Sequence, residues 1–123
     1  MTPFGRRLRE LRAARGITMK EMAAALRVTP AYLSALEHGK RGRPSWRLVQ
    51  AIIGYFNVIW DEAEELERLA RLSHPRIVID TSGLAPQATE AANILAEDIA
   101  QMTPAEIETL LALLKGRKRR PHA

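Results

Sequence analysis

The stretch TMKEMAAALRVTPAYLSALEHGK, residues 18–40, decides the fold predicted for this chain. It divides into two short helical runs separated by a tight turn. Thr18 and Glu21 form the capping-box pattern, in which each side chain binds the backbone N–H of the other residue. Thr29 suits the cap of the second run, and Pro30 suits its first position, where no N–H is needed. The pattern therefore predicts two helices connected by a short turn.

Two helices joined in this way match the unit that lays its second helix in the major groove of DNA. Further positions agree in register: Thr18, Glu21, Met22, Ala23, Val28, Tyr32, Leu33, Ser34, Leu36, Glu37, Gly39 and Lys40. Through these residues the chain resembles the Xre/lambda-repressor (Cro/CI) type of helix-turn-helix regulator, over roughly residues 4–56. The resemblance implies an all-α, lambda-repressor-like DNA-binding domain of five helices, with double-stranded DNA as its partner.

The charge distribution agrees with a nucleic-acid partner. Residues 1–60 contain eleven Lys and Arg against three acids, residues 61–114 contain three against eleven, and residues 115–123 add five bases. A basic first half suits binding to phosphates. The chain has no cysteine and no apolar run near the ~20 residues of a membrane span. We expect a cytoplasmic, nucleoid-associated protein without membrane contact.

The predicted recognition helix, residues 30–38, has a short and largely apolar outward face. It lacks the Arg, Lys, Asn and Gln that read bases by paired hydrogen bonds. We expect modest direct readout, with backbone contacts and DNA shape contributing more. The alternative is that base contacts come from arginines in the loop of residues 40–43. The residues expected to face bases are Thr29, Pro30, Ala31, Ser34 and Ala35.

Phosphates are expected to bind at two places. The first N–H groups of residues 18–26 attract anions through the helix dipole. The basic loop of residues 40–43 adds a contact that is independent of sequence and sensitive to salt. Arg27 occupies the turn, where a left-handed backbone would cost about 1 kcal/mol. The residues expected to face phosphates are Thr18, Met19, Lys20, Tyr32, His38, Lys40, Arg41 and Arg43.

One structural ion pair is implied by the resemblance. In the family, an Arg near the end of the first helix pairs with a Glu at the end of the recognition helix. The matching residues here are Arg12 and Glu37.

The remaining chain predicts further helices at residues 46–56, 61–72, 86–102 and 104–114, with Asp61 as a cap and Leu72 facing inward. Residues 76–80, a β-branched run, predict a strand that either pairs across a dimer or serves as an extended connector. We expect a DNA-binding domain at 1–73, a strand and helical hairpin for dimerisation at 74–114, and a basic disordered tail at 115–123. The residues expected at the dimer interface are Ile77, Val78, Ile79, Leu95, Ile99, Ile107, Leu110, Leu111 and Leu114.

These patterns favour a bacterial, sequence-specific transcriptional regulator, a repressor acting as a homodimer on a near-palindromic operator. The alternative is an antitoxin-type DNA-binding protein whose C-terminal helices bind a partner protein. The three histidines are widely separated, and the acids of residues 61–67 read as a solvated face rather than a metal site. No catalytic residue, metal or cofactor is expected, and the protein is not expected to be an enzyme.

Overall fold

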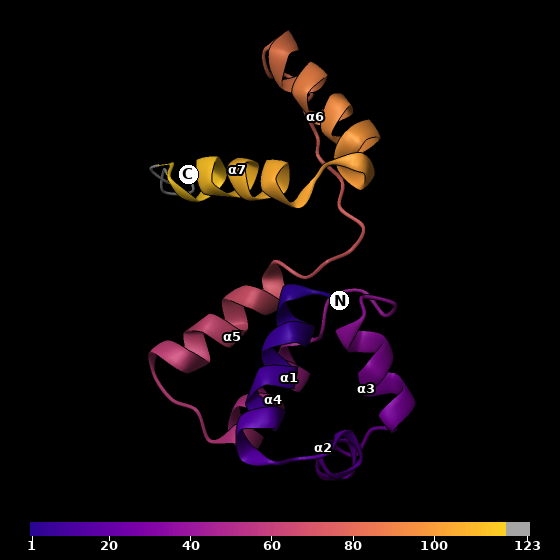
Figure 1. Ribbon diagram of the computed structural model, residues 1–123, viewed down its shortest axis with the longest axis vertical. Coiled ribbons are helices and arrows are strands. Elements are labelled where there is room, and N and C mark those ends of the chain that lie inside the picture. Colours follow the sequence, from indigo (N-terminus) through magenta and orange to yellow (C-terminus); the bar gives the residue numbers. More distant parts are fainter. Residues whose placement is uncertain (118–123) are drawn as a thin grey trace. The chain divides into compact units, whose positions relative to one another are not determined.

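The computed structural model describes residues 1–117, and these are helical or irregular (Figure 1). They divide into two compact units, Met1–Ile77 and the residues from Val78 onward. The prediction of an all-α chain is confirmed for the described residues. Their helices are α1 (Pro3–Arg15), α2 (Met19–Leu26), α3 (Pro30–Glu37), α4 (Trp46–Phe56), α5 (Asp61–Arg71), α6 (Pro86–Asp98), a 3₁₀ turn at Ile99–Gln101, and α7 (Pro104–Lys115).

Helices α1 to α5 of the first unit share one hydrophobic core. Helix α1 packs against α3 and α5, α2 packs against α3 and α4, and α4 packs against α5. The core therefore contacts one side of α3, the side that packs against α1 and α2. The opposite side of α3 faces away from the core. The largest fully buried apolar side chains are Phe4, Leu8, Met22, Leu33, Leu36, Ile52, Phe56 and Leu66.

The end of α5 departs from the prediction. Leu72, expected to face inward, is 54% exposed. The helix ends at Arg71, and the backbone of Leu72 already leaves the helical conformation at φ −90° and ψ 10°. The periodicity of an amphipathic helix no longer governs a residue beyond its end. Ser73 is buried instead, and its Oγ donates to the carbonyl of Leu69 at 2.5 Å.

The start of α5 also differs from the prediction, because Asp61 does not cap it. The cap position belongs to Trp60, whose backbone lies at φ 53° and ψ −122° and whose side chain makes no capping hydrogen bond. Its carbonyl accepts the first helical hydrogen bond, from the N–H of Glu64 at 3.0 Å. Asp61 thereby falls in the first turn, where its negative charge is favoured by the helix dipole.

The strand predicted for residues 76–80 is not present within the described chain. Ile77, Val78 and Ile79 are 69%, 95% and 54% exposed, in irregular backbone. A strand needs a neighbouring strand for its N–H and C=O groups, and β-branched composition alone does not supply one. Pairing of this segment across a dimer stays a prediction.

A local turn follows this segment at Asp80. The Asp80 carboxylate accepts two hydrogen bonds from Ser82, one from its hydroxyl and one from its backbone N–H at 2.9 Å. These hydrogen bonds favour the charged form and lower the pKa of Asp80.

The second unit has well-capped helices but no buried side chain in α6 or α7. Thr103 and Glu106 form a capping box, with Thr103 N–H donating to Glu106 Oε1 at 2.9 Å. This backbone hydrogen bond has the larger effect in lowering the pKa of Glu106, and a hydrogen bond with the Thr103 side chain lowers it further. The helix predicted for residues 86–102 is divided, because Ile99–Gln101 tighten into a 3₁₀ turn.

No extensive packing between α6 and α7 is seen in the described chain, so the hairpin stays a prediction. All nine residues expected at the dimer interface are exposed or half-buried. Lys115, expected in the tail, belongs to the last turn of α7. Residues 118–123 of the expected basic tail lie outside the described residues.

Candidate nucleic-acid interface

Helix α2 and the turn after it follow from local hydrogen bonds. The Thr18 hydroxyl accepts the Glu21 N–H at 3.0 Å, and the Glu21 carboxylate accepts the Thr18 N–H at 3.3 Å. Helix α2 ends at Leu26, and the C-cap residue Arg27 adopts the left-handed conformation at φ 58° and ψ 40°. A non-glycine residue there costs about 1 kcal/mol. The bond from Val28 N–H to the Ala23 carbonyl, at 3.0 Å, helps to offset this cost by closing the turn.

Helix α3 begins where the cap pattern predicts. Thr29 Oγ1 accepts the Tyr32 N–H at 3.0 Å, and Pro30 is the first helical residue. Leu33, Leu36 and Glu37 are buried on the inner side. The five residues expected to face bases lie away from that side: Thr29, Pro30 and Ala31 are exposed, and Ser34 and Ala35 are half-buried.

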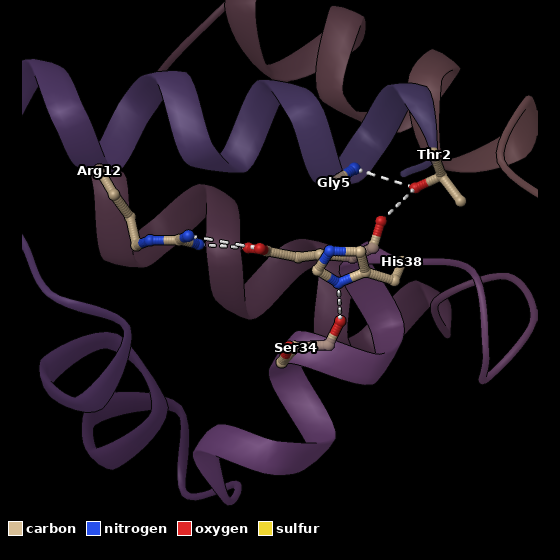
Figure 2. Close-up of polar contacts among 6 residues, drawn as sticks. Thr2, Gly5, Arg12, Ser34 and His38 are labelled. Carbon is tan, nitrogen blue, oxygen red and sulfur yellow. Dashed lines mark hydrogen bonds and ion pairs between the residues drawn. The ribbon is translucent and has the colours of Figure 1, made fainter.

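The residues expected to face phosphates occupy both ends of this helix pair. At the start of α2, Thr18 and Lys20 are exposed, whereas Met19 is half-buried and packs against the core. Beyond α3, the loop of residues 40–43 presents three exposed cations, Lys40, Arg41 and Arg43. The exposed residue His38 places its ring Nδ1 2.9 Å from the backbone carbonyl of Ser34 (Figure 2). Tyr32 is half-buried and lies under the Arg41 guanidinium.

Arg12 and Glu37, the pair implied by the family resemblance, meet inside the first unit (Figure 2). Both guanidinium nitrogens of the Arg12 fork reach the carboxylate, Nη2 at 3.3 Å from Oε1 and Nη1 closer to Oε2. The Glu37 side chain is fully buried and that of Arg12 is 9% exposed. A buried ion pair with two hydrogen bonds connects the end of α3 to α1, and it restricts the orientation of α3 relative to α1.

A second tie between α1 and α3 was not predicted. The Thr2 N–H donates to the Glu37 carbonyl at 3.0 Å, and the Thr2 hydroxyl lies 3.3 Å from the same oxygen. The hydroxyl also accepts the Gly5 N–H at 3.0 Å and so caps α1 (Figure 2). The dipeptide of Thr2 followed by Pro3 is a helix-start signal that would have revealed the cap. Its contact with Glu37 is a tertiary feature.

Gly5 allows this close approach, because it has no side chain. A Cβ at this position would lie 2.7 Å from the Glu37 Cα and 2.8 Å from its carbonyl carbon. Gly5→Ala should therefore force α1 and α3 apart and lower the free energy of unfolding by about 1–3 kcal/mol. Chemical denaturation of the purified protein measures this loss.

Gly54 provides the matched control for that substitution. It lies within α4, and a Cβ there would meet nothing within 4 Å. Gly54→Ala should raise the free energy of unfolding by about 0.5–1 kcal/mol, because alanine restricts the unfolded chain. Equal effects of the two substitutions would show that Gly5 is not required for the contact.

Two other kinds of site, a metal centre and a membrane span, are not found among the described residues. The part of the chain that the structure describes contains no group of three or more His, Asp or Glu side chains placed to hold a metal ion. Within those same residues, no helix combines the length and apolar character needed to cross a bilayer. The surface built by α2, α3 and the following loop is the candidate site, because the side of α3 that faces away from the core lies between exposed cations at the start of α2 and in the loop after α3.

Comparison with known proteins agrees with this geometry. A family model described as a helix-turn-helix domain matches residues 3–69. The HTH-type transcriptional regulator DdrOP3 of Deinococcus deserti is 34% identical over 118 residues, which cover 93% of this chain and 83% of that protein. The uncharacterized HTH-type transcriptional regulator RghRB of Bacillus subtilis is 36% identical over 61 residues, half of this chain.

The match to the Bacillus protein spans 44% of that protein's length, so the likeness there concerns one part of it. No solved structure matches the chain significantly. The family model, however, covers more than half of the chain, and the Deinococcus relative is matched over most of both proteins. The chain belongs to the helix-turn-helix family of DNA-binding transcriptional regulators.

Proposed function

We propose that the chain is a sequence-specific repressor of the Xre/lambda-repressor type, which acts in the cytoplasm at the nucleoid. The observation that carries this proposal is the presentation of α3. Its inner side is held by Leu33, Leu36 and the buried Glu37, and its first residues are open to solvent. A short helix held in this way from one side suits entry into a major groove.

Base contacts come from the open side of α3. Pro30, Ala31 and Ala35 offer apolar contact to thymine methyl groups, and the hydroxyls of Thr29 and Ser34 offer single hydrogen bonds. Such a set discriminates weakly by itself. DNA shape and backbone contacts therefore supply a large part of the specificity.

Phosphate contacts flank α3 on both sides. The first turn of α2 directs its free N–H groups and the Lys20 ammonium to one phosphate, with Thr18 and Met19 beside them. Tyr32, His38 and the loop cations Lys40, Arg41 and Arg43 lie along the other stretch of backbone. These contacts give affinity that decreases as salt is added.

The protein acts as a homodimer assembled through its second unit. Dimerisation is supported by the exposure of apolar side chains in this unit. Ile99, Leu111 and Leu114 are 48%, 38% and 51% exposed, and the described helices of this unit contain no buried residue. Apolar surface of this kind is stabilised when a second copy covers it. Two α3 helices then reach successive major grooves about 34 Å apart, on a near-palindromic operator.

Selection of bound sequences from random DNA tests the proposed function. The expected product is a two-fold symmetric site with half-sites about one helical turn apart. The mass of the free protein, measured by light scattering, should be that of two chains. Recovery of no preferred sequence would contradict sequence-specific regulation.

Leu111→Asp tests the dimer. The substitution places a charge in the apolar stripe that Leu111 forms with Ile107, Leu110 and Leu114 on α7. The expected result is a monomer in solution, with operator affinity weaker by about tenfold or more because the two half-sites no longer bind as a unit. Ala112→Asp is the matched control, since helical spacing puts Ala112 on the other side of α7. A dimer that survives Leu111→Asp would contradict this interface.

The exposed apolar residues of α6 and α7 also suit a second candidate, an antitoxin-type protein whose C-terminal helices hold a different polypeptide. Purification from the native host discriminates the two. A stoichiometric second polypeptide would favour the antitoxin, and a pure homodimer favours the repressor.

A further inference from the structure

The recognition helix presents a shortage of hydrogen-bond donors. Guanine and adenine are read most strongly by side chains that make two parallel hydrogen bonds, chiefly Arg, Lys, Asn and Gln. None of these stands between Thr29 and His38. The open side of α3 therefore has no side chain that recognises a purine by two bonds. A donor of that kind can come only from a neighbouring segment.

Arg41 is placed to supply it. Its guanidinium carbon lies 5.6 Å from the centroid of the Tyr32 ring, within the range of a cation–π contact. Tyr32 is itself fixed in the first turn of α3, because its N–H is bonded to Thr29 Oγ1 at 3.0 Å. The ring thus holds a guanidinium from the following loop against the recognition helix.

The backbone of the loop is tied to α3 as well. The Lys40 N–H donates to the Ala35 carbonyl at 2.8 Å, and Gly39 takes the left-handed conformation at φ 78° that allows this return. The position of Arg41 is therefore restricted twice, by the hydrogen bond of the preceding residue Lys40 and by the contact of its own guanidinium with Tyr32. Among the described cations of this loop, Arg41 is the one that makes a cation–π contact.

We propose that Tyr32 is a positioning residue that holds Arg41 beside α3, and that Arg41 in this position reads a guanine edge and determines specificity. The inference rests on the proposed function and changes one part of it, because Arg41 then contacts a base in place of a phosphate. A cation–π contact engages the guanidinium through the ring face and uses none of its N–H groups in a conventional hydrogen bond, so the fork that matches guanine O6 and N7 stays available. A guanidinium held in advance also loses less rotamer freedom on binding. Lys40 and Arg43 supply charge independent of sequence.

Arg41→Lys separates charge from shape, since lysine keeps the positive charge and lacks the planar fork. Affinity is measured on the selected operator and on every single base-pair substitution of one half-site, at several salt concentrations. The expected result is loss of roughly tenfold or more of discrimination at one guanine, with an unchanged salt slope. Arg43→Lys is the matched control and should leave the discrimination at every position unchanged.

Variants of Tyr32 test the positioning role. Tyr32→Phe keeps the ring and should retain the discrimination, whereas Tyr32→Leu removes the ring and should behave as Arg41→Lys does. In the Arg41→Lys background, Tyr32→Leu should cause no further loss of discrimination. Thermal unfolding of each variant shows that it is folded, and the Arg41→Lys result stands even where Tyr32→Leu unfolds.

Two results would overturn the inference alone. One is full discrimination at every guanine in Arg41→Lys, and the other is loss of discrimination in Tyr32→Phe. In both cases the proposed function stands if a preferred operator is still bound by the unaltered protein. Absence of any preferred sequence for the unaltered protein would instead remove the proposed function, and this inference with it.

Discussion

Ala31→Glu should weaken binding to the selected operator by about a hundredfold or more, because it places a negative charge where α3 is proposed to meet DNA. Ala31 is exposed in the first turn of α3. A carboxylate there would face the negative potential of the groove with no cation on the same helix to neutralise it. Titration of labelled operator by fluorescence anisotropy measures the loss.

The fold should tolerate this change. The helix dipole favours a negative charge in the first turn, and no core contact is lost at an exposed alanine. The melting temperature of Ala31→Glu should therefore equal that of the unaltered protein within about 2 °C. A weaker complex formed by an equally stable protein assigns the effect to the interface.

Ala51→Glu is the matched control. Ala51 is an exposed alanine on α4 and is not among the residues proposed to face DNA. The same charge added there should change operator affinity by less than about threefold, since it acts through screened charge alone. If the two variants bind equally well, α3 is not the recognition helix.

Arg12→Ala should lower the free energy of unfolding by about 3–5 kcal/mol, as much as truncation of a buried core side chain. The substitution leaves the Glu37 carboxylate fully buried without its ion partner. A buried charge that has lost its counter-ion keeps the whole cost of leaving water. Urea denaturation, followed by circular dichroism, measures the change.

An exposed ion pair on the same helix supplies the control. Arg6 Nε lies 3.6 Å from Glu10 Oε1, and the Arg6 side chain is 82% exposed. Arg6→Ala should cost less than about 1 kcal/mol, because water screens the pair. The double variant Arg12→Met with Glu37→Leu should recover most of the stability lost in Arg12→Ala, since apolar residues of similar size remove the uncompensated charge. Similar losses for Arg12→Ala and Arg6→Ala would show that the buried pair has no special weight.

The buried pair also bears on recognition. Glu37 ends α3 and is held by Arg12 through its side chain and by Thr2 through its carbonyl. Both ties lead to α1, so Glu37 is one point at which α1 helps to set the orientation of α3. Loss of operator affinity in Arg12→Ala at a temperature where the variant is still folded is expected for this reason.

The sequence determined the starts of most helices in this protein. Thr18 with Glu21 and Thr29 with Pro30 each cap a helix where their pattern predicts, and Thr103 with Glu106 forms the same local capping box at the start of α7. Capping can be read in this way because cap and helix are within four residues, and no distant part of the chain is involved. The pattern failed at Asp61, where the backbone turn at Trp60 sets the helix start.

Apart from the Arg12–Glu37 pair, which the family resemblance implied, only the tertiary structure decided which side chains meet across the fold. Ser73 Oγ accepts the Phe4 N–H at 2.9 Å, and Thr2 reaches Glu37, although 69 and 35 residues separate these pairs. The cation–π contact of Arg41 with Tyr32 likewise depends on how the loop returns to α3. Residues 76–80 show the same limit, since β-branched composition specifies a preference for extended backbone and not a partner. The preference of a residue for helix or strand depends on its neighbours in the sequence. A contact between distant side chains depends instead on how the helices pack, which involves residues from many parts of the chain.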